Sequence, residues 1–452
     1  MRLPDYFLAD LPPEASVSAA MLTEACQTLK RNREQYLAHR STEFLIELLS
    51  ETAQRWLHAD YALRGLALAG AEGLGFSRPT LAAGLDAFFG QLTRANLVGL
   101  MEQELNHHHR LDRFFAAGHE RMAQRAATVT GPELIVHVTA GNLPNPALMS
   151  IVLGLLTRAA QFVKCASGAS LVPRLFAHSI YEAEPKLGAC LELAEWKGGQ
   201  KSLESALFAE ADFVTATGTD ETIRAIRQEA PEHARFLGYG HRVSFGYLTH
   251  ETLGAARLKK IVERAADDVV AWDQLGCLSP HVFYVEHGAG VTAEEFAEAL
   301  AQELDRREAH QPRGPLPVPV AALIASRRSF YQLRAAHSRD TRLWQSSGST
   351  AWTVVFESDP RFQLSCLHRF VYVKSVTDLR QALQAADHVR RKVSTVGLAA
   401  SEERAVTIAT ELARWGAARV CPLGQMQNPP LAWRHDGRPP LADMLRWTDW
   451  EQ

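Results

Sequence analysis

The stretch ELIVHVTAGNLPNPALMSIVLGLLTRAAQFVKCA, residues 133–166, decides the fold class. It contains a short β-rich run at 133–140, the loop GNLPNP, an apolar segment of helical length and a second β-rich run at 161–166. Short strands that alternate with helices of this length predict βαβ units and a parallel sheet. The first turn lacks the pattern G-x-G-x-x-G, so the ordinary dinucleotide-binding fingerprint is missing.

The alternation continues toward the C-terminus, whereas the segment before it has a different pattern. Residues 14–125 carry apolar residues at three and four spacing and are rich in Ala and Leu, which predicts helices. Helices are also expected at 252–276 and 292–307. Further β-rich runs lie at 189–199, 211–218, 233–248, 281–288, 318–330, 350–358, 368–376 and 418–423. The expected fold class is therefore α/β with a helical N-terminal region.

Length and composition restrict the possible function classes. A chain of 452 residues is too long for one core and predicts two or three domains. Its formal net charge of -3 argues against a nucleic acid or an acidic membrane surface as the main partner. No apolar run reaches the roughly 18 residues of a membrane span, and the first residues lack the layout of a signal peptide. These features together predict a cytoplasmic protein.

The cysteines suggest reduced thiols, one of which is a candidate nucleophile. The six cysteines are scattered without a C-x-x-C pair, which argues against a disulfide framework and against a metal site. Cys277 lies in AWDQLGCLSPHVFYVE (271–286), after a predicted helix and before a hydrophobic strand. A thiol at such a loop, with backbone N–H groups around it, can act as a nucleophile and hold an oxyanion. Local sequence alone favours the other interpretation, a small buried core residue.

Five motifs occur in an order that resembles one superfamily. They are HVTAGNLPNPAL, FVKCASG, DFVTATGTDETI, WDQLGCLSP and the tail GQMQNPPLAWRHDGRPPLADMLRWTDWE. On these motifs the region from Leu134 to Glu451 resembles the aldehyde dehydrogenase superfamily and, more narrowly, the LuxC-type acyl-CoA reductases. The resemblance implies two three-layer α/β domains, a Rossmann-like cofactor domain and a catalytic domain, with the nucleophile in the cleft between them.

The implied organisation has four parts. A helical region (1–130) packs on the cofactor domain, and a Rossmann-like NADP-binding domain follows at 131–250. The catalytic domain with its nucleophilic cysteine occupies 251–425. A tail at 426–452 returns to the cofactor and oligomerisation side.

The resemblance assigns a nucleophile and an oxyanion donor. Cys277 matches the superfamily's nucleophile. Asn142, in GNLP, matches the Asn whose side-chain amide donates to the developing oxyanion, a role that suits an amide N–H. The same Asn could instead be a turn residue before Pro144; with Cys277 in place, the functional interpretation is the stronger one.

The resemblance also assigns a cofactor site. Lys164 matches the Lys that bonds the adenosine ribose hydroxyls, and Ser167 stands where many NAD-linked members carry an acid. Ser can bond a 2′-phosphate that a carboxylate would repel, and Ser170 and Arg174 could add donors, so NADPH is favoured and NADH is the alternative. Thr217, Gly218 and Thr219 match the turn that approaches the dinucleotide phosphates, although a plain strand-to-helix cap has the same sequence.

A missing carboxylate points to the reaction. Hydrolytic aldehyde dehydrogenases carry a Glu before a Gly-Gly pair, whereas the corresponding FLGYGHRVSFG (236–246) has no acid. Without that base an acyl-enzyme is not hydrolysed efficiently, which favours reduction of an acyl thioester to an aldehyde. The alternatives are an acyl-phosphate or semialdehyde dehydrogenase, a hydrolytic aldehyde dehydrogenase with a displaced base, and a non-catalytic nucleotide-binding partner. His241 and Arg242 in this stretch receive no chemical role.

Partners and two further histidine motifs complete the expectations. The resemblance implies an acyl-CoA or acyl-carrier thioester as substrate, a homodimer or homotetramer, and an acyl-protein synthetase as a possible partner. His107–His109 cannot all face one ion from a helix, so a solvated or partner-facing surface is expected. His435 and Asp436 suit a packing role better than a catalytic one.

Overall fold

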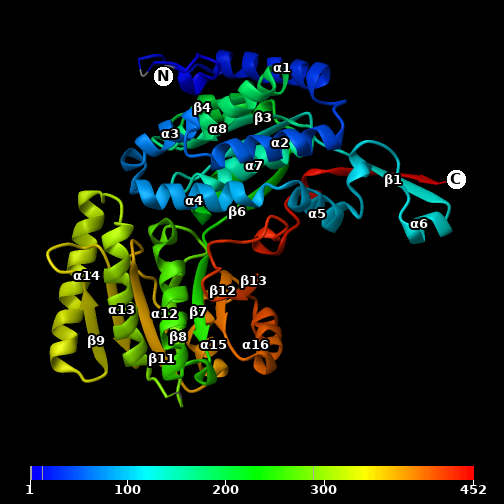
Figure 1. Ribbon diagram of the computed structural model, residues 1–452. Helices are drawn as coiled ribbons and strands as arrows, with labels where there is room; N and C mark the ends of the chain where they lie inside the picture. The colour runs from blue at the N-terminus through cyan, green and yellow to red at the C-terminus, as the bar shows by residue number, and fades with distance from the viewer. Residues whose placement is uncertain (1–2, 13, 289, 452) are drawn as a thin grey trace. The chain divides into compact units, whose positions relative to one another are not determined.

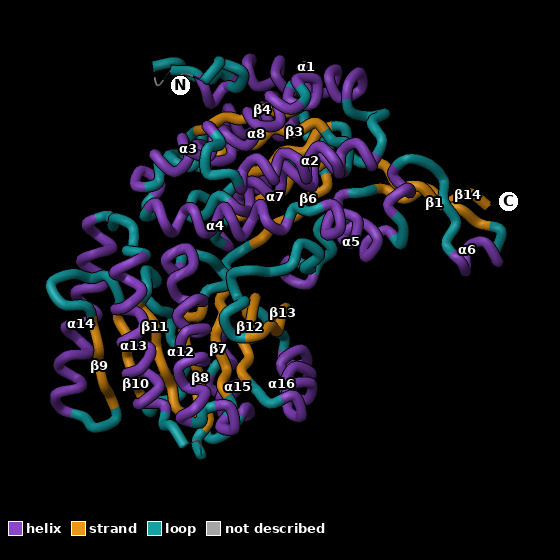
Figure 2. Tube along the Cα trace, in the orientation of Figure 1, coloured by secondary structure: helices purple, strands orange, loops and turns teal. Residues whose placement is uncertain are grey.

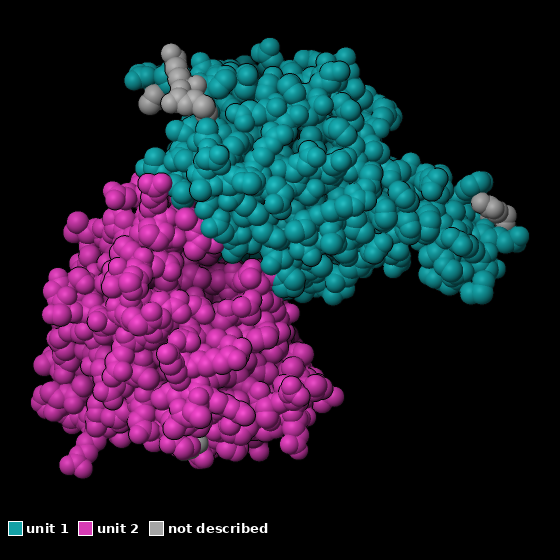
Figure 3. All heavy atoms as spheres, viewed as in Figure 1, with its two compact units in different colours: residues 1–70, 85–240, 430–452 teal, residues 71–84, 241–429 magenta. Residues whose placement is uncertain are grey.

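The computed structural model describes residues 3–12, 14–288 and 290–451. It divides into two compact units, which Figure 3 colours separately. The first comprises the residues up to 70, 85–240 and those from 430 on; the second comprises 71–84 and 241–429. The division therefore falls after Gly240 and not after His250, because residues 243–248 form a strand of the second unit's sheet.

A five-stranded parallel sheet forms the centre of the first unit, in the order β4-β3-β2-β5-β6 (Figure 1). Its strands are β2 (Leu134–Val138), β3 (Ala160–Cys165), β4 (Leu191–Glu195), β5 (Phe213–Thr217) and β6 (Arg235–Tyr239). Every residue of β2 and β3 is buried, as expected for parallel strands with both faces covered. The run at 233–248 was expected to be one segment, but it contains two strands, β6 and β7 (Val243–Leu248), in different sheets.

Helices cover both faces of this sheet. The helices of the first unit are α1 (Ala19–Tyr36), α2 (Thr42–Leu57), α3 (Ala62–Ala69), α5 (Arg94–Leu105), α6 (Gly118–Met122), α7 (Asn145–Leu156), α8 (Leu171–Ala183), α9 (Pro185–Gly188), α10 (Lys201–Ala209) and α11 (Asp220–Glu229), and α4 (Arg78–Gln91) runs across the boundary at 84/85. One core joins apolar residues of α1, α10 and α11 to β2 and β3. On the other side, the Trp56 indole of α2 stacks on Phe89 and donates to Ser179 Oγ of α8 at 3.0 Å.

An antiparallel ribbon joins residues far apart in the sequence. It pairs β1 (Arg125–Thr130) with β14 (Arg446–Glu451), in the register Arg125↔Glu451 to Thr130↔Arg446. The segment before β14 is fixed to the first unit, since the backbone N–H groups of Leu441 and Ala442 donate to Glu104 Oε2 at 2.8 and 2.7 Å. All six residues of β14 are exposed.

The second unit is built on a seven-stranded sheet in the order β13-β12-β7-β8-β11-β10-β9 (Figure 2). The strands that follow β7 are β8 (Pro280–Glu286), β9 (Thr341–Gln345), β10 (Thr353–Glu357), β11 (Phe370–Val376), β12 (Val393–Ala399) and β13 (Arg419–Pro422). All neighbours are parallel except the edge strand β9, which is antiparallel to β10. Strands β9 and β12 were not expected from the sequence.

Two cores lie on opposite faces of this sheet and make three layers. The first core joins the sheet to α12 (Ala255–Val270) and α13 (Ala293–His310). The second joins it to α14 (Val318–His337), α15 (Leu379–Ala385) and α16 (Glu402–Trp415). The β-rich run expected at 318–330 is wrong, because this segment is helical and buries Ile324, Arg328 and Tyr331, which are four and three residues apart. Among the described residues, no helix combines the length and apolar character of a membrane span.

Candidate functional site

Cys277 lies in the turn between α12 and β8. The helix expected over 252–276 ends earlier, at Val270, and a short 3-10 turn follows at Ala271–Gln274. Within that turn Trp272, Asp273 and Gln274 have positive φ values of 53°, 50° and 65°. Left-handed backbone at non-glycine residues costs roughly 1–3 kcal/mol each and persists only where surrounding contacts impose it. Strain therefore lies directly before the candidate nucleophile.

A second left-handed segment faces the first and is tied to it by a buried ion pair. Leu367, His368 and Arg369 also have positive φ values, from 54° to 65°. Arg369 Nε donates to Asp273 Oδ1 at 2.9 Å, its Nη2 lies 2.6 Å from the same oxygen as an ion pair, and both side chains are buried. Burial raises the pKa of Asp273, which the Arg369 charge opposes. The pair holds two turns that local propensity alone does not favour.

Gln274 adds a second tie between the same segments. Its side-chain amide donates to the carbonyl oxygens of Pro280 at 2.8 Å and Phe370 at 2.9 Å. The first bond closes the loop that contains Cys277, since Pro280 begins β8. Sequence reasoning missed both Asp273 and Gln274, although the motif WDQLGC contained them, because their role depends on residues about ninety positions later.

The Cys277 peptide is also held directly. Ser244 of β7 donates its hydroxyl to the Cys277 carbonyl oxygen at 2.8 Å and accepts from the Thr395 backbone N–H of β12 at 3.1 Å. Ser244 is fully buried. Cys277 and Cys366 are partly exposed, whereas Cys26, Cys165, Cys190 and Cys421 are buried. Partial exposure on a fixed turn is what a thiol needs to meet a substrate.

A loop after β13 completes the packing around the turn. A Cβ on Gly276 would lie 2.5 Å from Gln427 Nε2, so only glycine fits at position 276 without a shift of the Gln427 amide. The same amide donates to Ser279 Oγ. Asp268 of α12 fixes the same loop by accepting from the N–H groups of Gly424 at 2.6 Å and Met426 at 2.8 Å.

Asp268 predicts a dependence of stability on pH. Burial raises the pKa of its carboxyl to about 7, although the two backbone donors oppose the shift. Because the folded-state pKa lies above the unfolded value of about 3.9, the folded state favours the protonated carboxyl. Protonation of Asp268 therefore stabilises the fold below about pH 4, and this stabilisation is lost as pH rises through about 7. We expect the difference in unfolding free energy between Asp268→Asn and the natural chain (variant minus natural) to increase by about 1–3 kcal/mol from pH 5 to pH 8. Urea unfolding of both proteins at the two pH values measures it, and an unchanged difference contradicts it.

The other predicted site residues lie in the first unit, on loops that follow parallel strands. Asn142 is exposed in the loop between β2 and α7. A Cβ on the adjacent Gly141 would lie 3.1 Å from the Cβ of Ala166, so the loops after β2 and β3 approach closely. Asn145 Oδ1, at the start of α7, is buried without a hydrogen-bond partner among the described residues. The structure thus brings the Asn142 loop beside the loop that carries Ser167.

Lys164 lies near the end of β3 and is buried. Its Nζ lies 5.5 Å from the centre of the Trp196 ring. A Cβ on Gly198 would lie 4.0 Å from the same Nζ. Burial lowers the pKa of this ammonium, while Glu204, Cys165 and Glu195 act in the opposite direction. The absence of a side chain at Gly198 leaves space beside the ammonium.

The loop after Lys164 contains a feature that sequence reasoning missed. Ser167 is exposed and Ser170 is buried. The carboxylate of Glu195, at the end of β4, accepts from the backbone N–H groups of Gly168 at 2.5 Å and Ser170 at 3.3 Å. Arg174, which could add a donor here, has its Nη1 engaged with the Ala9 carbonyl oxygen at 2.6 Å.

The turn at Thr217–Thr219 joins β5 to α11. The Gly218 N–H donates to the Tyr239 carbonyl oxygen at 3.1 Å, and Thr219 caps α11 by accepting from the Thr222 N–H at 3.2 Å. Asp220 and Glu221 fill the first turn of that helix. The strand-to-helix cap is therefore present. Two carboxylates already interact with the partial positive charge of the helix N-terminus.

Comparison with known proteins identifies the family. The sequence matches the family model described as acyl-CoA reductase (LuxC) over residues 37–447. The chain belongs to the LuxC acyl-CoA reductase family. The resemblance drawn from the five motifs is confirmed.

Two relatives of this LuxC chain carry the same kind of name. It is 23% identical over 366 residues to long-chain acyl-protein thioester reductase 2 of Photobacterium leiognathi, covering 80% of this chain and 72% of that protein. It is also 23% identical over 428 residues to the long-chain acyl-protein thioester reductase of Vibrio harveyi, covering 92% and 84%.

The fold is that of the aldehyde dehydrogenases. The NADP-dependent glyceraldehyde-3-phosphate dehydrogenase of Bacillus halodurans, solved with NADP, superposes with a TM-score of 0.72 at 12% identity, over 96% of this chain and 92% of that one. The expected aldehyde-dehydrogenase-like α/β class is confirmed.

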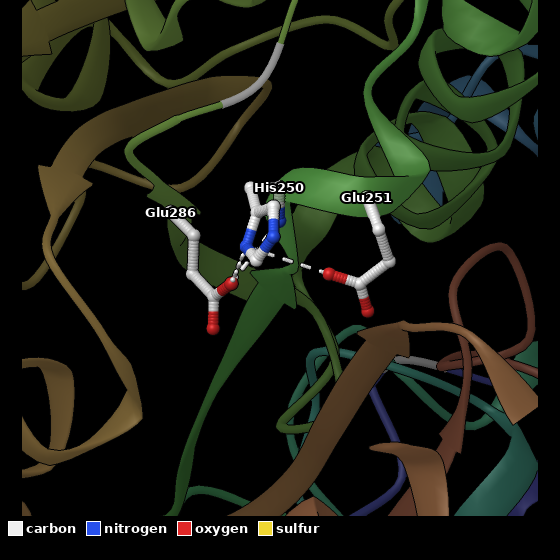
Figure 4. Close-up of side chains that lie close together, drawn as sticks. All are labelled: His250, Glu251 and Glu286. Carbon is white, nitrogen blue, oxygen red and sulfur yellow. Dashed lines mark hydrogen bonds and ion pairs between the residues drawn. The ribbon is translucent and has the colours of Figure 1, made fainter. Parts of the chain in front are cut away.

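His250, Glu251 and Glu286 form a histidine–carboxylate cluster of this LuxC chain (Figure 4). Glu286 ends β8, whereas Cys277 lies before the start of that strand. His250 Nδ1 is 2.9 Å from Glu286 Oε2, and Glu251 is the third member. Arg404 donates at 2.8 Å to both carboxylates. Burial opposes ionisation of Glu286, but hydrogen bonds from Arg404 and Tyr247 outweigh it and lower its pKa to about 2. The guanidinium already supplies the positive charge that a metal ion would bring, so the cluster is an ion-pair network.

The remaining histidine motifs pack against aromatic rings. His107 stacks on Phe115 with ring centres 3.8 Å apart and on His108 at 4.8 Å. The expected solvated surface at His107–His109 is therefore only partly correct, since all three are half-buried. His435 stacks on Tyr239 at 4.2 Å, which is a packing contact.

Proposed function

We propose that this LuxC-family chain reduces the acyl group of a thioester, a fatty acyl-CoA or an acyl-protein, to the aldehyde with NADPH through a covalent intermediate on Cys277. The observation that carries the proposal is the turn before Cys277, where left-handed backbone is held by a buried ion pair. Strain that the surrounding structure imposes is typical of functional positions. The names of the relatives, long-chain acyl-protein thioester reductases, support the substrate class.

The residues of the first unit fit a nicotinamide dinucleotide. Lys164 offers an ammonium beside the open position at Gly198, and Ser167 offers an exposed hydroxyl. Asn145 Oδ1 is a buried acceptor with no hydrogen-bond partner in the described part of the chain. Lys164, Ser167 and Ser170 would hold the adenosine ribose and its 2′-phosphate, and the turn Thr217–Thr219 the pyrophosphate. The cofactor, when bound, supplies a hydride to the acyl carbon.

The chemistry of the chain's own residues proceeds in two stages. The Cys277 thiolate attacks the thioester carbonyl carbon, and the Asn142 amide with the Cys277 backbone N–H stabilises the oxyanion. The carbon–sulfur bond to the donor breaks, and that thiol leaves with the proton that Cys277 gave up. After reduction of the acyl carbon the Cys277 carbon–sulfur bond breaks, which releases the aldehyde and restores the thiolate.

The stretch 236–246 supports reduction over hydrolysis. It forms the end of β6, a short connection and the start of β7, and it contains no carboxylate that could activate water. Ser244, which belongs to this stretch, donates its hydroxyl to the Cys277 carbonyl oxygen. This segment therefore offers no carboxylate to activate water against an acyl group on Cys277.

Replacing Asn142 by alanine tests the oxyanion role. We expect kcat for acyl-CoA reduction to fall by about 10² to 10³, the usual cost of one oxyanion donor, with a much smaller change in KM. Steady-state cofactor oxidation measures both. A fall in kcat below about threefold contradicts the assignment of Asn142.

A chain-length series tests the proposed function as a whole. Acyl-CoAs of increasing length are assayed with NADPH and with NADH by cofactor absorbance, and the aldehyde is trapped as its hydrazone. Oxidation of NADPH with stoichiometric aldehyde supports the proposal. Activity confined to acyl-phosphates, acid formed with NAD, or nucleotide binding without turnover identifies the three alternatives and overturns it.

The assembly of the chain is part of the same proposal. The exposed strand β14 carries Trp447 and Trp450, and Phe114 contacts Trp450 with ring centres 5.6 Å apart. We propose that copies of the chain associate through the ribbon β1–β14 as a homodimer or homotetramer, with an acyl-protein synthetase as a further partner. Exposed aromatic side chains on a ribbon suit such a contact.

A further inference from the structure

A carboxylate from a neighbouring strand occupies the loop that follows Lys164. Glu195 is the last residue of β4 and lies opposite Cys165 in the register of β3 and β4. Its two oxygens accept from the N–H groups of Gly168 and Ser170. A phosphate bound at this loop would need such N–H groups as donors, and the Glu195 carboxylate already uses them.

The negative charges around Lys164 also disfavour a phosphate at this loop. Glu204 Oε1 accepts from the Gly199 N–H at 2.8 Å, and a Cβ on Gly198 would lie 4.0 Å from both Glu204 Oε1 and Lys164 Nζ. The charges of Glu204 and Glu195 both act on the Lys164 ammonium. Arg174 does not compensate for them, since it donates to Ala9 and lies 3.6 Å from Asp10 Oδ1.

We infer that Glu195 is the residue that sets the balance between NADPH and NADH. The inference rests on the proposed function, in which Lys164 meets the adenosine ribose. A ribose 2′-hydroxyl can donate to a carboxylate at the end of a strand, whereas a 2′-phosphate brings further negative charge to the same place. Glu195 thus weakens the preference for NADPH that Ser167 supports and keeps NADH as a second hydride donor.

Binding of cofactor fragments to the full chain tests this without turnover. Calorimetry measures the dissociation constants of 2′,5′-ADP, which carries the 2′-phosphate, and of 5′-AMP, which has the free hydroxyl. The variants are Glu195→Gln, which keeps one acceptor oxygen, and Glu195→Ala, which frees both N–H groups for the phosphate. Glu192→Gln is the matched control, because Glu192 lies on the same strand and accepts from the N–H groups of Leu8 and Leu193.

Both Glu195 variants are expected to bind 2′,5′-ADP at least about tenfold more tightly than the natural chain at low salt, with a smaller gain at high salt. Affinity for 5′-AMP should stay equal or fall, and Glu192→Gln should change neither fragment by more than about twofold. Equal changes for the two fragments, no change in either, or no binding of either fragment by any variant overturns the inference. A natural chain that fails to reduce acyl thioesters, but whose Glu195 variants show the shift, rejects the reductase proposal and keeps the role of Glu195.

Discussion

Substitution of Cys277 by serine is expected to lower the rate of acyl thioester reduction by at least about 10³-fold. Removal of a catalytic nucleophile typically costs several orders of magnitude in kcat, and a serine hydroxyl is a much weaker nucleophile than a thiolate at neutral pH. The variant should keep its fold, because Cys277 is partly exposed and the bond from Ser244 is to its backbone carbonyl. Steady-state cofactor oxidation with an acyl-CoA measures the loss.

Cys421→Ser is the matched control for this experiment. Cys421 belongs to the same unit, and burial raises the pKa of its thiol to about 12, which leaves it protonated and unreactive. This variant should retain activity within about threefold. Retention of full turnover by Cys277→Ser, or equal losses in the two variants, would remove Cys277 from the mechanism.

The second large effect concerns stability. Arg369→Met leaves the Asp273 carboxylate buried without its ion-pair partner, and loss of one member of a buried pair costs about 3–5 kcal/mol. For a unit of this size such a loss lowers the unfolding temperature by about 10 °C. Arg369 also donates to Glu308 Oε2 and to the Gln311 carbonyl oxygen at 3.0 and 2.9 Å, so the effect should lie at the upper end. Calorimetric unfolding measures it.

A double variant separates the ion pair from these other contacts. If Asp273 is the main reason for the loss, Asp273→Asn combined with Arg369→Met should be less destabilised than the sum of the two single variants, by more than about 1 kcal/mol. Strict additivity would show that the pair does not hold the two left-handed turns together.

The sequence predicted the parts of the fold that depend on local pattern. Strands β2, β3 and β5 lie within short β-rich runs and were expected within a few residues of their bounds. The end of α12 was not, because left-handed backbone at Trp272–Gln274 has no propensity signal and is imposed by Arg369, which lies far along the chain. The segment 318–330 was misassigned because Val and Ile at its start suggest a strand, while the burial of every third or fourth residue shows a helix.

The residues of the candidate site also divide into those that local sequence predicts and those that depend on distant contacts. Cys277, Asn142 and Lys164 were found through motifs that are contiguous in sequence, and their roles remain predictions. Glu195 was missed because its effect on the Ser167 loop depends on the pairing of β3 with β4. Ser244 was missed for a similar reason, since a serine in a strand carries no signal that its hydroxyl reaches the Cys277 carbonyl oxygen. Sequence motifs named the candidate reacting groups, and the tertiary structure showed which side chains contact their loops.

The central claim is a covalent acyl-enzyme on Cys277, and intact mass spectrometry of the natural chain tests it most directly. Incubated with hexadecanoyl-CoA in the absence of a nicotinamide cofactor, the chain should gain the mass of one hexadecanoyl group. The adduct should map to the peptide containing Cys277, be removed by hydroxylamine and disappear with release of hexadecanal when NADPH is added. An unmodified chain that still produces the aldehyde with NADPH, or an acyl group attached at another residue, would contradict the account.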